Sequence, residues 1–258
     1  MIDAEPPAAA VAPLPVWPAV AETYRLVFGN IAVLAKISAL PFVLMVLIGA
    51  ASTLLDPLSY RLAWEFGTEI PWTLMAVAWL RHLLLAPGPG NVPFFPKLQR
   101  RHLHLLGYAL LLSVAHLPLT LFPYIADFLS LPDGSAVYWV LYLPLFYIGL
   151  RFSFIYAATA VDENYSLAVA WRHTRGIARN LFIAAAMTAL VPGKIFDYLL
   201  GLALAAKSDS GVGFAVALLW HAGMWVLEAL YLALFAVAFR TCTGWVPAAD
   251  KAILERFE

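Results

Sequence analysis

Long apolar runs alternate with short polar and basic stretches along this chain, and the length of the runs gives the first prediction. A helix needs about 20 mostly apolar residues to cross a hydrocarbon core roughly 30 Å thick. Six segments satisfy this requirement, with ends defined to within a few residues: 31–55, 70–86, 104–126, 136–161, 180–205 and 213–240. The pattern therefore predicts an all-α integral membrane bundle of six transmembrane helices.

Two further stretches are more polar and are predicted to form short interfacial helices. One precedes the first segment (AETYRLVFGN) and one follows the fourth (SLAVAWRHTRGIARN). In the second stretch, Arg172, Arg175 and Arg179 share one face if the helix continues through Gly176. Trp171 is expected to anchor this helix at the lipid headgroups.

The six-span region is predicted to occupy residues 21–245, between two tails. Residues 1–20 carry two acidic residues, no basic residue and five prolines, which indicates a disordered tail rather than a signal peptide. Residues 246–258 are expected to form a short cytoplasmic tail.

Composition supports a membrane location. Of the 258 residues, 63% are hydrophobic and 12% are charged, which is more apolar surface than a soluble domain can bury. Most of the 18 prolines and 15 glycines fall between the apolar runs or at their ends, as in a helical bundle rather than a barrel of short alternating strands.

The basic residues are divided unevenly between the two sides of the membrane. With six crossings, only Arg61, Lys194 and Lys207 of the 16 basic residues fall on one side, and all the others fall on the opposite side. Cytoplasmic loops and helix ends hold an excess of Lys and Arg. Both termini are therefore predicted to be cytoplasmic.

Arg151 lies inside the fourth apolar segment. Residues 136–150 are too few to cross the hydrocarbon, so the helix is expected to continue through Arg151 toward Asp162. At the rise of an α-helix, Arg151 then lies roughly 16 Å above Asp162, near the middle of the membrane. An unpaired arginine at this depth costs at least about 2.5 to 3.5 kcal/mol, so a partner is expected.

Glu228 is the predicted partner of Arg151. It is the one acidic residue of the sixth segment and lies about 18 Å above Arg240, and His116 lies at a similar height in the third segment. We predict an interior ion pair between Arg151 and Glu228, with His116 or a tyrosine completing the hydrogen bonds. The cluster either fixes helix packing or binds an ion, a proton or a polar substrate group; a third possibility is a simple snorkelling arginine.

The basic cytoplasmic face is expected to contact anionic lipid headgroups, with no nucleic acid involved. Two groups of residues are the candidates for this contact: Arg172, Arg175 and Arg179, and Lys97, Arg100 and Arg101. An additional protein partner is left open.

Motifs for catalysis, metals or cofactors were sought and none is predicted. His102 and His104 are two residues apart, so they point to opposite sides of a helix, and no Cys or carboxylate lies close by. No phosphate-binding loop, nucleophile elbow or HExxH pattern occurs. Cys242 is the single cysteine, which excludes an internal disulfide. Lys194 and Asp197 are one helical turn apart and are expected to form a surface pair, with a transport site as the alternative.

The stretch RFSFIYAATAVDENYSLAVAWRHTRGIARNLFIAAA, together with VAWLRHLLLAPG and RRHLHLLGYALLLS, resembles the membrane domain of bacterial glycerophosphodiester phosphodiesterases and related uncharacterised six-span families. The resemblance implies a bacterial inner-membrane protein. It carries over no catalytic residue, because the soluble catalytic barrel of those enzymes has no counterpart in this sequence.

The expected function is that of an inner-membrane protein without catalytic chemistry, acting as a lipid-contacting scaffold or partner-binding subunit. The alternative is a small transporter or channel that uses the Arg151, Glu228 and His116 cluster. An intramembrane enzyme is a third possibility.

Overall fold

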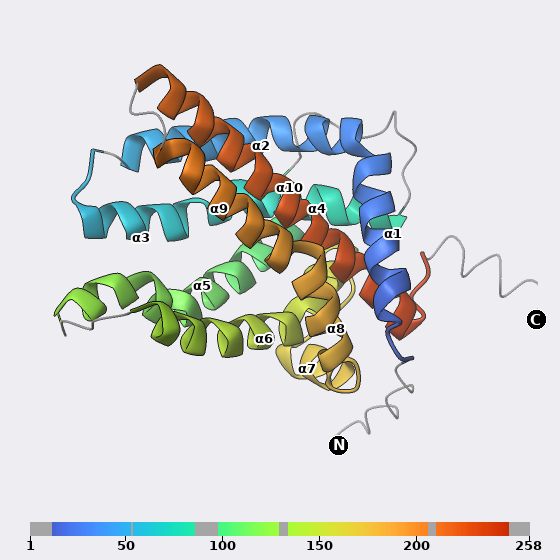
Figure 1. The fold of residues 1–258 in the computed structure, drawn as a ribbon. Coiled ribbons are helices and arrows are strands. Elements are labelled where there is room, and N and C mark those ends of the chain that lie inside the picture. The colour runs from blue at the N-terminus through green and yellow to red at the C-terminus, as the bar shows by residue number, and fades with distance from the viewer. Residues whose placement is uncertain (1–11, 53, 86–97, 129–133, 206–209, 248–258) are drawn as a thin grey trace, which may run out of the picture.

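The computed structural model describes residues 12–52, 54–85, 98–128, 134–205 and 210–247 (Figure 1). Within these ranges the regular structure is entirely helical, and no strand occurs. The prediction of an all-α protein is confirmed for the described part of the chain.

Five of the described helical runs are long and apolar enough to cross a membrane. They are α2 (Ile31–Ser52), α5 (Arg100–Phe128), α6 (Gly134–Ala160), a run formed by α8 (Ala178–Ala185), the π-helical η2 (Ala186–Leu190) and α9 (Val191–Ala205), and α10 (Ser210–Thr243). Large apolar side chains on these helices stay exposed, among them Leu47, Val140 and Leu219, as expected for surfaces that face lipid. The chain is therefore a multi-pass membrane protein.

The predicted segment 70–86 corresponds to α4 (Glu69–Leu85), which has 17 residues and is preceded by α3 (Pro57–Gly67) with only Thr68 between them. The sequence analysis predicted no helix between the spans 31–55 and 70–86, and the structure adds α3 there. Asp56 begins α3 by accepting hydrogen bonds from the backbone N–H groups of Leu58 and Ser59, at 3.1 Å each.

Proline explains why α3 and α4 are separate helices. Pro71 has no N–H to donate to the carbonyl of Gly67, four residues earlier, so the helix is interrupted at this point. The flanking N–H groups of Thr68 and Trp72 still donate to carbonyls one turn back, at 3.1 and 3.0 Å. Helices α3 and α4 therefore follow each other directly, with only Thr68 between them, and Thr68 lines the cavity described below.

Helix α4 packs inside the bundle against α2, α5, α6 and α10. The indole Nε1 of Trp79, which is fully buried, donates to the carbonyl of Ala229 in α10 at 3.1 Å. Because α4 is enclosed by other helices, its polar residues can face the protein interior instead of lipid.

The start of α1 (Val16–Gly29) lies beside the end of α10, and we call this the terminal end of the molecule. Ala12 N–H donates to the Cys242 carbonyl at 3.2 Å, and the side chain of Asn180 donates to the carbonyl of buried Leu14 at 2.9 Å. The prediction of a tail up to residue 20 was wrong from about Leu14 onward. The opposite end, where α2 ends and α3 and α10 begin, is called the distal end (Figure 1).

Helix α7 (Leu167–Arg175) begins at Ser166, whose hydroxyl accepts from the Val169 N–H at 3.2 Å. It ends before Gly176, and α8 starts at Ala178 after a short turn. The helix therefore does not continue through Gly176, which was the condition for the three arginines to share one face, and α7 packs back along α6.

The turn between α6 and α7 is fixed by two arginines from other helices. Asp162 adopts a left-handed backbone conformation with φ of 63°, which closes the end of α6. Its carboxylate forms an ion pair with Arg101 of α5 and lies 3.4 Å from Arg81 of α4. Arg81 also donates to the carbonyl of Ala160 at 2.7 Å. These contacts tie three helices together at the terminal end.

Candidate functional site

Arg151 lies in α6 as predicted, because the helix continues unbroken to Ala160. Its side chain is buried, with 6% of the residue exposed. The predicted ion pair with Glu228 is absent. Instead, the Nε of Arg151 donates to the Thr174 hydroxyl at 3.0 Å, and Nη2 donates to the carbonyl of Trp171.

The partners of Arg151 all come from α7. The guanidinium carbon lies 3.9 Å from the centre of the Trp171 ring, which adds a cation–π contact to the two hydrogen bonds. The Thr174 hydroxyl in turn lies 2.8 Å from the carbonyl of Arg151 and 2.8 Å from that of Ala170, and can donate to either. Trp171, expected at the lipid headgroups, therefore serves as one wall of an arginine-binding pocket. We call Arg151, Trp171 and Thr174 the arginine clasp.

The side chain of Arg151 faces a different direction from the one that the predicted ion pair requires. Successive helical residues are rotated by about 100°. Gly149 and Leu150 face an internal cavity that contains Glu228, whereas Arg151, the next residue, faces α7. A count of residues along each helix therefore does not show which side chains face each other.

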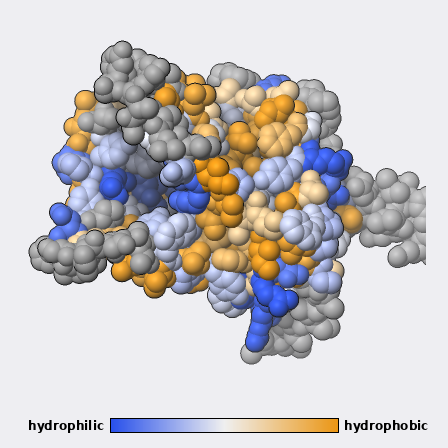
Figure 2. All heavy atoms as spheres, in the orientation of Figure 1, coloured by the Kyte–Doolittle hydropathy of each residue, from blue (hydrophilic) through white to orange (hydrophobic). Residues whose placement is uncertain are grey.

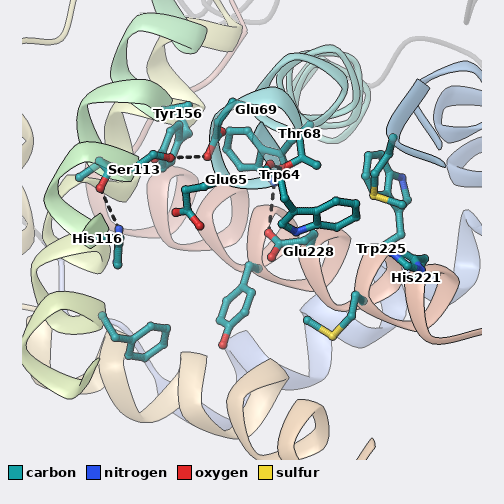
Figure 3. A pocket seen from close by; sticks show the side chains of 18 of the residues that line it. Trp64, Glu65, Thr68, Glu69, Ser113, His116, Tyr156, His221, Trp225 and Glu228 are labelled. Carbon is teal, nitrogen blue, oxygen red and sulfur yellow. Dashed lines mark hydrogen bonds between the residues drawn. The ribbon is translucent and has the colours of Figure 1, made fainter. Parts of the chain in front are cut away.

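The cavity has a volume of about 430 Å³ and lies between α3, α4, α5, α6 and α10 (Figure 3). Three carboxylates line it: Glu65 at the end of α3, Glu69 at the start of α4, and Glu228 in α10. The junction of α3 and α4 places Glu65 and Glu69 one helical turn apart, so both reach the same space. We call this space, with its three carboxylates, the acidic cavity.

Neutral donors hold two of the carboxylates. The indole Nε1 of Trp72 donates to Glu228 at 3.2 Å, and the hydroxyl of buried Ser113 donates to Glu69 at 2.6 Å (Figure 3). Glu65 forms no hydrogen bond or ion pair with the residues that the structure describes. Among the described residues that line the acidic cavity, none is a lysine or an arginine.

His116 of α5 also lines the acidic cavity, so the structure brings two of the three predicted cluster residues, Glu228 and His116, to one space. Its Nδ1 lies 2.8 Å from the carbonyl of Leu112, one turn earlier in the helix. This contact positions the ring on its own helix and leaves Nε2 as the nitrogen available to a ligand.

Aromatic rings form much of the remaining wall. Pairs in edge-to-face contact include Trp72 with Tyr156, at 5.4 Å between centroids, and Trp64 with His221, at 5.3 Å. The further rings of the lining are Tyr142, Phe146, Trp220, Trp225, Tyr231 and Phe235. The cavity thus combines negative charge with π-electron faces.

The acidic cavity opens toward the distal end. Figure 2 shows the surface hollowed there, with hydrophilic residues around the hollow. Glu228 lies twelve residues before Arg240, or roughly 18 Å along α10 at the helical rise, and the helix continues to Thr243. A polar group that enters from the distal end therefore reaches carboxylates near the middle of the bundle.

The residues predicted to contact anionic lipid are in different situations. Arg100, Arg172, Arg175 and Arg179 are exposed near the terminal end, whereas Arg101 is mostly buried in its ion pair with Asp162. Lys97 lies outside the described residues. Lys194 and Asp197 form the expected pair, at 3.3 Å, and Asp197 also accepts from the indole of Trp220 at 3.1 Å.

The sequence analysis missed Glu65 and Glu69, which were assigned to the side of the membrane opposite the termini. One signal pointed to them: Trp64, Thr68 and Trp72 recur every four residues beside the two acids, which indicates a helix with one aromatic and acidic face.

No His, Cys, Asp and Glu side chains of the described residues form a group of three or more that is arranged to hold a metal ion. No protein-family model, curated protein or solved structure matches this chain. The chemistry of the acidic cavity therefore follows from the side chains that line it.

Proposed function

We propose that this chain is a small membrane transporter whose solute-binding site is the acidic cavity. The observation that carries the proposal is a cavity lined by carboxylates from two separate parts of the bundle, inside a multi-pass membrane protein and open at one end. Ionisable groups in the interior of a membrane bundle are costly, and they are typical of substrate and ion pathways.

Two irregular helices support the proposal, one that lines the acidic cavity and one that packs on α10. The junction of α3 and α4 supplies Glu65 and Glu69, and interrupted helices in transporters typically place charged groups at a midplane binding site. The π-helical η2 interrupts the run of α8 and α9, which packs on α10. Such π-helical turns are frequent at functional sites, because they allow one part of a helix to shift relative to the other.

The proposal includes an orientation. Six crossings, with α3 and α4 together forming the second, place both termini in the cytoplasm of a bacterial inner membrane. The uneven distribution of basic residues and the resemblance to the six-span families support this arrangement. The distal end then faces outward, so the acidic cavity opens to the outside.

Alternating access is the expected behaviour of a transporter, and a single introduced thiol can detect it. Thr68→Cys is placed in a Cys242→Ser background, since Thr68 lines the acidic cavity and Cys242 is the one native cysteine. In oriented vesicles, a membrane-impermeant thiol reagent is expected to modify this cysteine from the outside and, more slowly, from the inside. Modification is measured by mass spectrometry as a function of time.

Two matched positions calibrate the sides of the membrane. Leu54→Cys, at the exposed turn after α2, is expected to react only from outside, and Arg175→Cys, at the end of α7, only from inside. If Thr68→Cys reacts strictly from one side under all conditions, the transport proposal is wrong, although the cavity can still bind a ligand.

The lipid-contacting scaffold or partner-binding subunit is the second candidate. It is favoured by Arg172, Arg175 and Arg179, which stay exposed on α7 and α8 near the terminal end. Purification in mild detergent that retains anionic lipid or a second protein, together with one-sided access at Thr68→Cys, is the result that favours the scaffold over the transporter.

A further inference from the structure

We propose that the ligand of the acidic cavity is an organic cation, with an ammonium group attached to an apolar body. This inference rests on the proposed function for its site and adds the chemical class of the ligand. It is carried by three carboxylates and a wall of aromatic rings that face one open space, with no lysine or arginine among the described residues of the lining.

The charges in the cavity favour a cation. Glu65, Glu69 and Glu228 face one space in a bundle interior where the dielectric is low, so like charges there repel one another strongly. Ser113 and Trp72, which donate to Glu69 and Glu228, are neutral and supply no positive charge. A bound cation removes this repulsion, whereas an anion of the same size adds to it.

The aromatic wall favours a cation that carries carbon. Tryptophan and tyrosine faces attract an ammonium group within about 6 Å of the ring centre, most strongly where water is excluded. Here Trp64 and Trp72 lie on the same segment as Glu65 and Glu69, so rings and carboxylates can act on one ligand together. Aromatic rings combined with carboxylates recognise substituted ammonium groups.

The size and the remaining lining favour an organic ion over a bare inorganic one. The volume of about 430 Å³ is within the range of sites for small organic molecules. Met45, Leu112, Leu150 and Met224 give the wall apolar patches that match an apolar body. The carboxylates come from different helices and form no group arranged for a metal ion among the described residues.

Calorimetric titration of the purified full-length chain in detergent tests the inference. The probes are phenyltrimethylammonium, which carries a cation on an aromatic body, and benzenesulfonate, an anion of similar size. We expect binding of phenyltrimethylammonium and at least about tenfold weaker binding of benzenesulfonate. Glu65→Gln and Glu228→Gln are each expected to weaken cation binding by about tenfold, because each removes a charged partner of the ligand.

Asp127→Asn is the matched control, since it removes one carboxylate from the exposed end of α5, outside the cavity lining, and is expected to leave binding unchanged. Glu65 forms no hydrogen bond or ion pair with the described residues, so Glu65→Gln remains informative even if Glu228→Gln perturbs folding.

Each outcome bears on a different claim. Equal binding of the two probes, no binding of the cation, or unchanged affinity in both Gln variants overturns the inference. Cation binding together with one-sided access at Thr68→Cys keeps the inference and refutes transport. Two-sided access without cation preference keeps transport and refutes the inference.

Discussion

Arg151→Ala is expected to lower the free energy of unfolding by about 3 kcal/mol, one of the largest effects of any single substitution in the described part of the chain. The variant loses two hydrogen bonds from a charged group and the cation–π contact with Trp171. It also leaves the buried Thr174 hydroxyl without the donor that it accepts from. The thermal midpoint in detergent, followed by circular dichroism, measures the effect.

Two further variants show that the arginine clasp, and not a pair with Glu228, is responsible. Arg175→Ala removes an exposed arginine from the same segment and is expected to change stability by less than about 0.5 kcal/mol. Adding Glu228→Ala to Arg151→Ala should give the sum of the two single effects, because the two residues share no contact. A double variant that loses clearly less stability than the sum of the two single effects would indicate a direct Arg151–Glu228 pair and contradict the structure.

Glu228→Gln is the second substitution with a large expected effect, and it is expected to raise the stability of the ligand-free protein. The amide oxygen of Gln still accepts from the indole of Trp72, while one of three mutually repelling carboxylates is removed. We expect the ligand-free protein to become more stable by about 1 kcal/mol, as binding sites often retain charges at the expense of stability. The affinity for an organic cation should fall at the same time.

Thermal unfolding of Glu228→Gln and the unmodified chain at neutral pH, with and without phenyltrimethylammonium, measures both effects. The unmodified chain should gain stability on adding the cation, and the variant should gain little. A variant that is less stable than the unmodified chain without ligand would show that the carboxylate is structural.

Helix lengths were predictable from the sequence, because the hydrophobic requirement of a membrane acts on each segment separately. The apolar runs of α2, α5, α6 and α10 match the predicted segments to within a few residues. The same hydrophobic requirement explains why helix α3 was not predicted, because Arg61 and Glu65 make this segment too polar to meet it. In the structure, the acidic and aromatic face of α3 lines an internal cavity instead of contacting lipid.

Partners of buried groups were not predictable from depth alone. Counting residues gave Arg151 and Glu228 the same height, but a pair also requires the two side chains to face each other across the bundle. The turn between α6 and α7, which includes Asp162, sets this direction, because it brings α7 back along α6 and places Trp171 and Thr174 beside Arg151. The residues of the arginine clasp could be read from the sequence. The packing of α7 back along α6, which brings them together, could not.

The rate of thiol modification at Thr68→Cys by reagents of opposite charge tests the central claim most directly. In the Cys242→Ser background, cationic and anionic methanethiosulfonates of similar size are applied at the distal face, and the ratio of their rates cancels the reactivity of the thiol itself. The account predicts that the cation reacts faster by about tenfold or more, and that this ratio falls toward one in the additional presence of Glu65→Gln and Glu228→Gln. Equal rates for the two reagents, or a ratio unaffected by both Gln substitutions, would contradict an acidic cavity open to water.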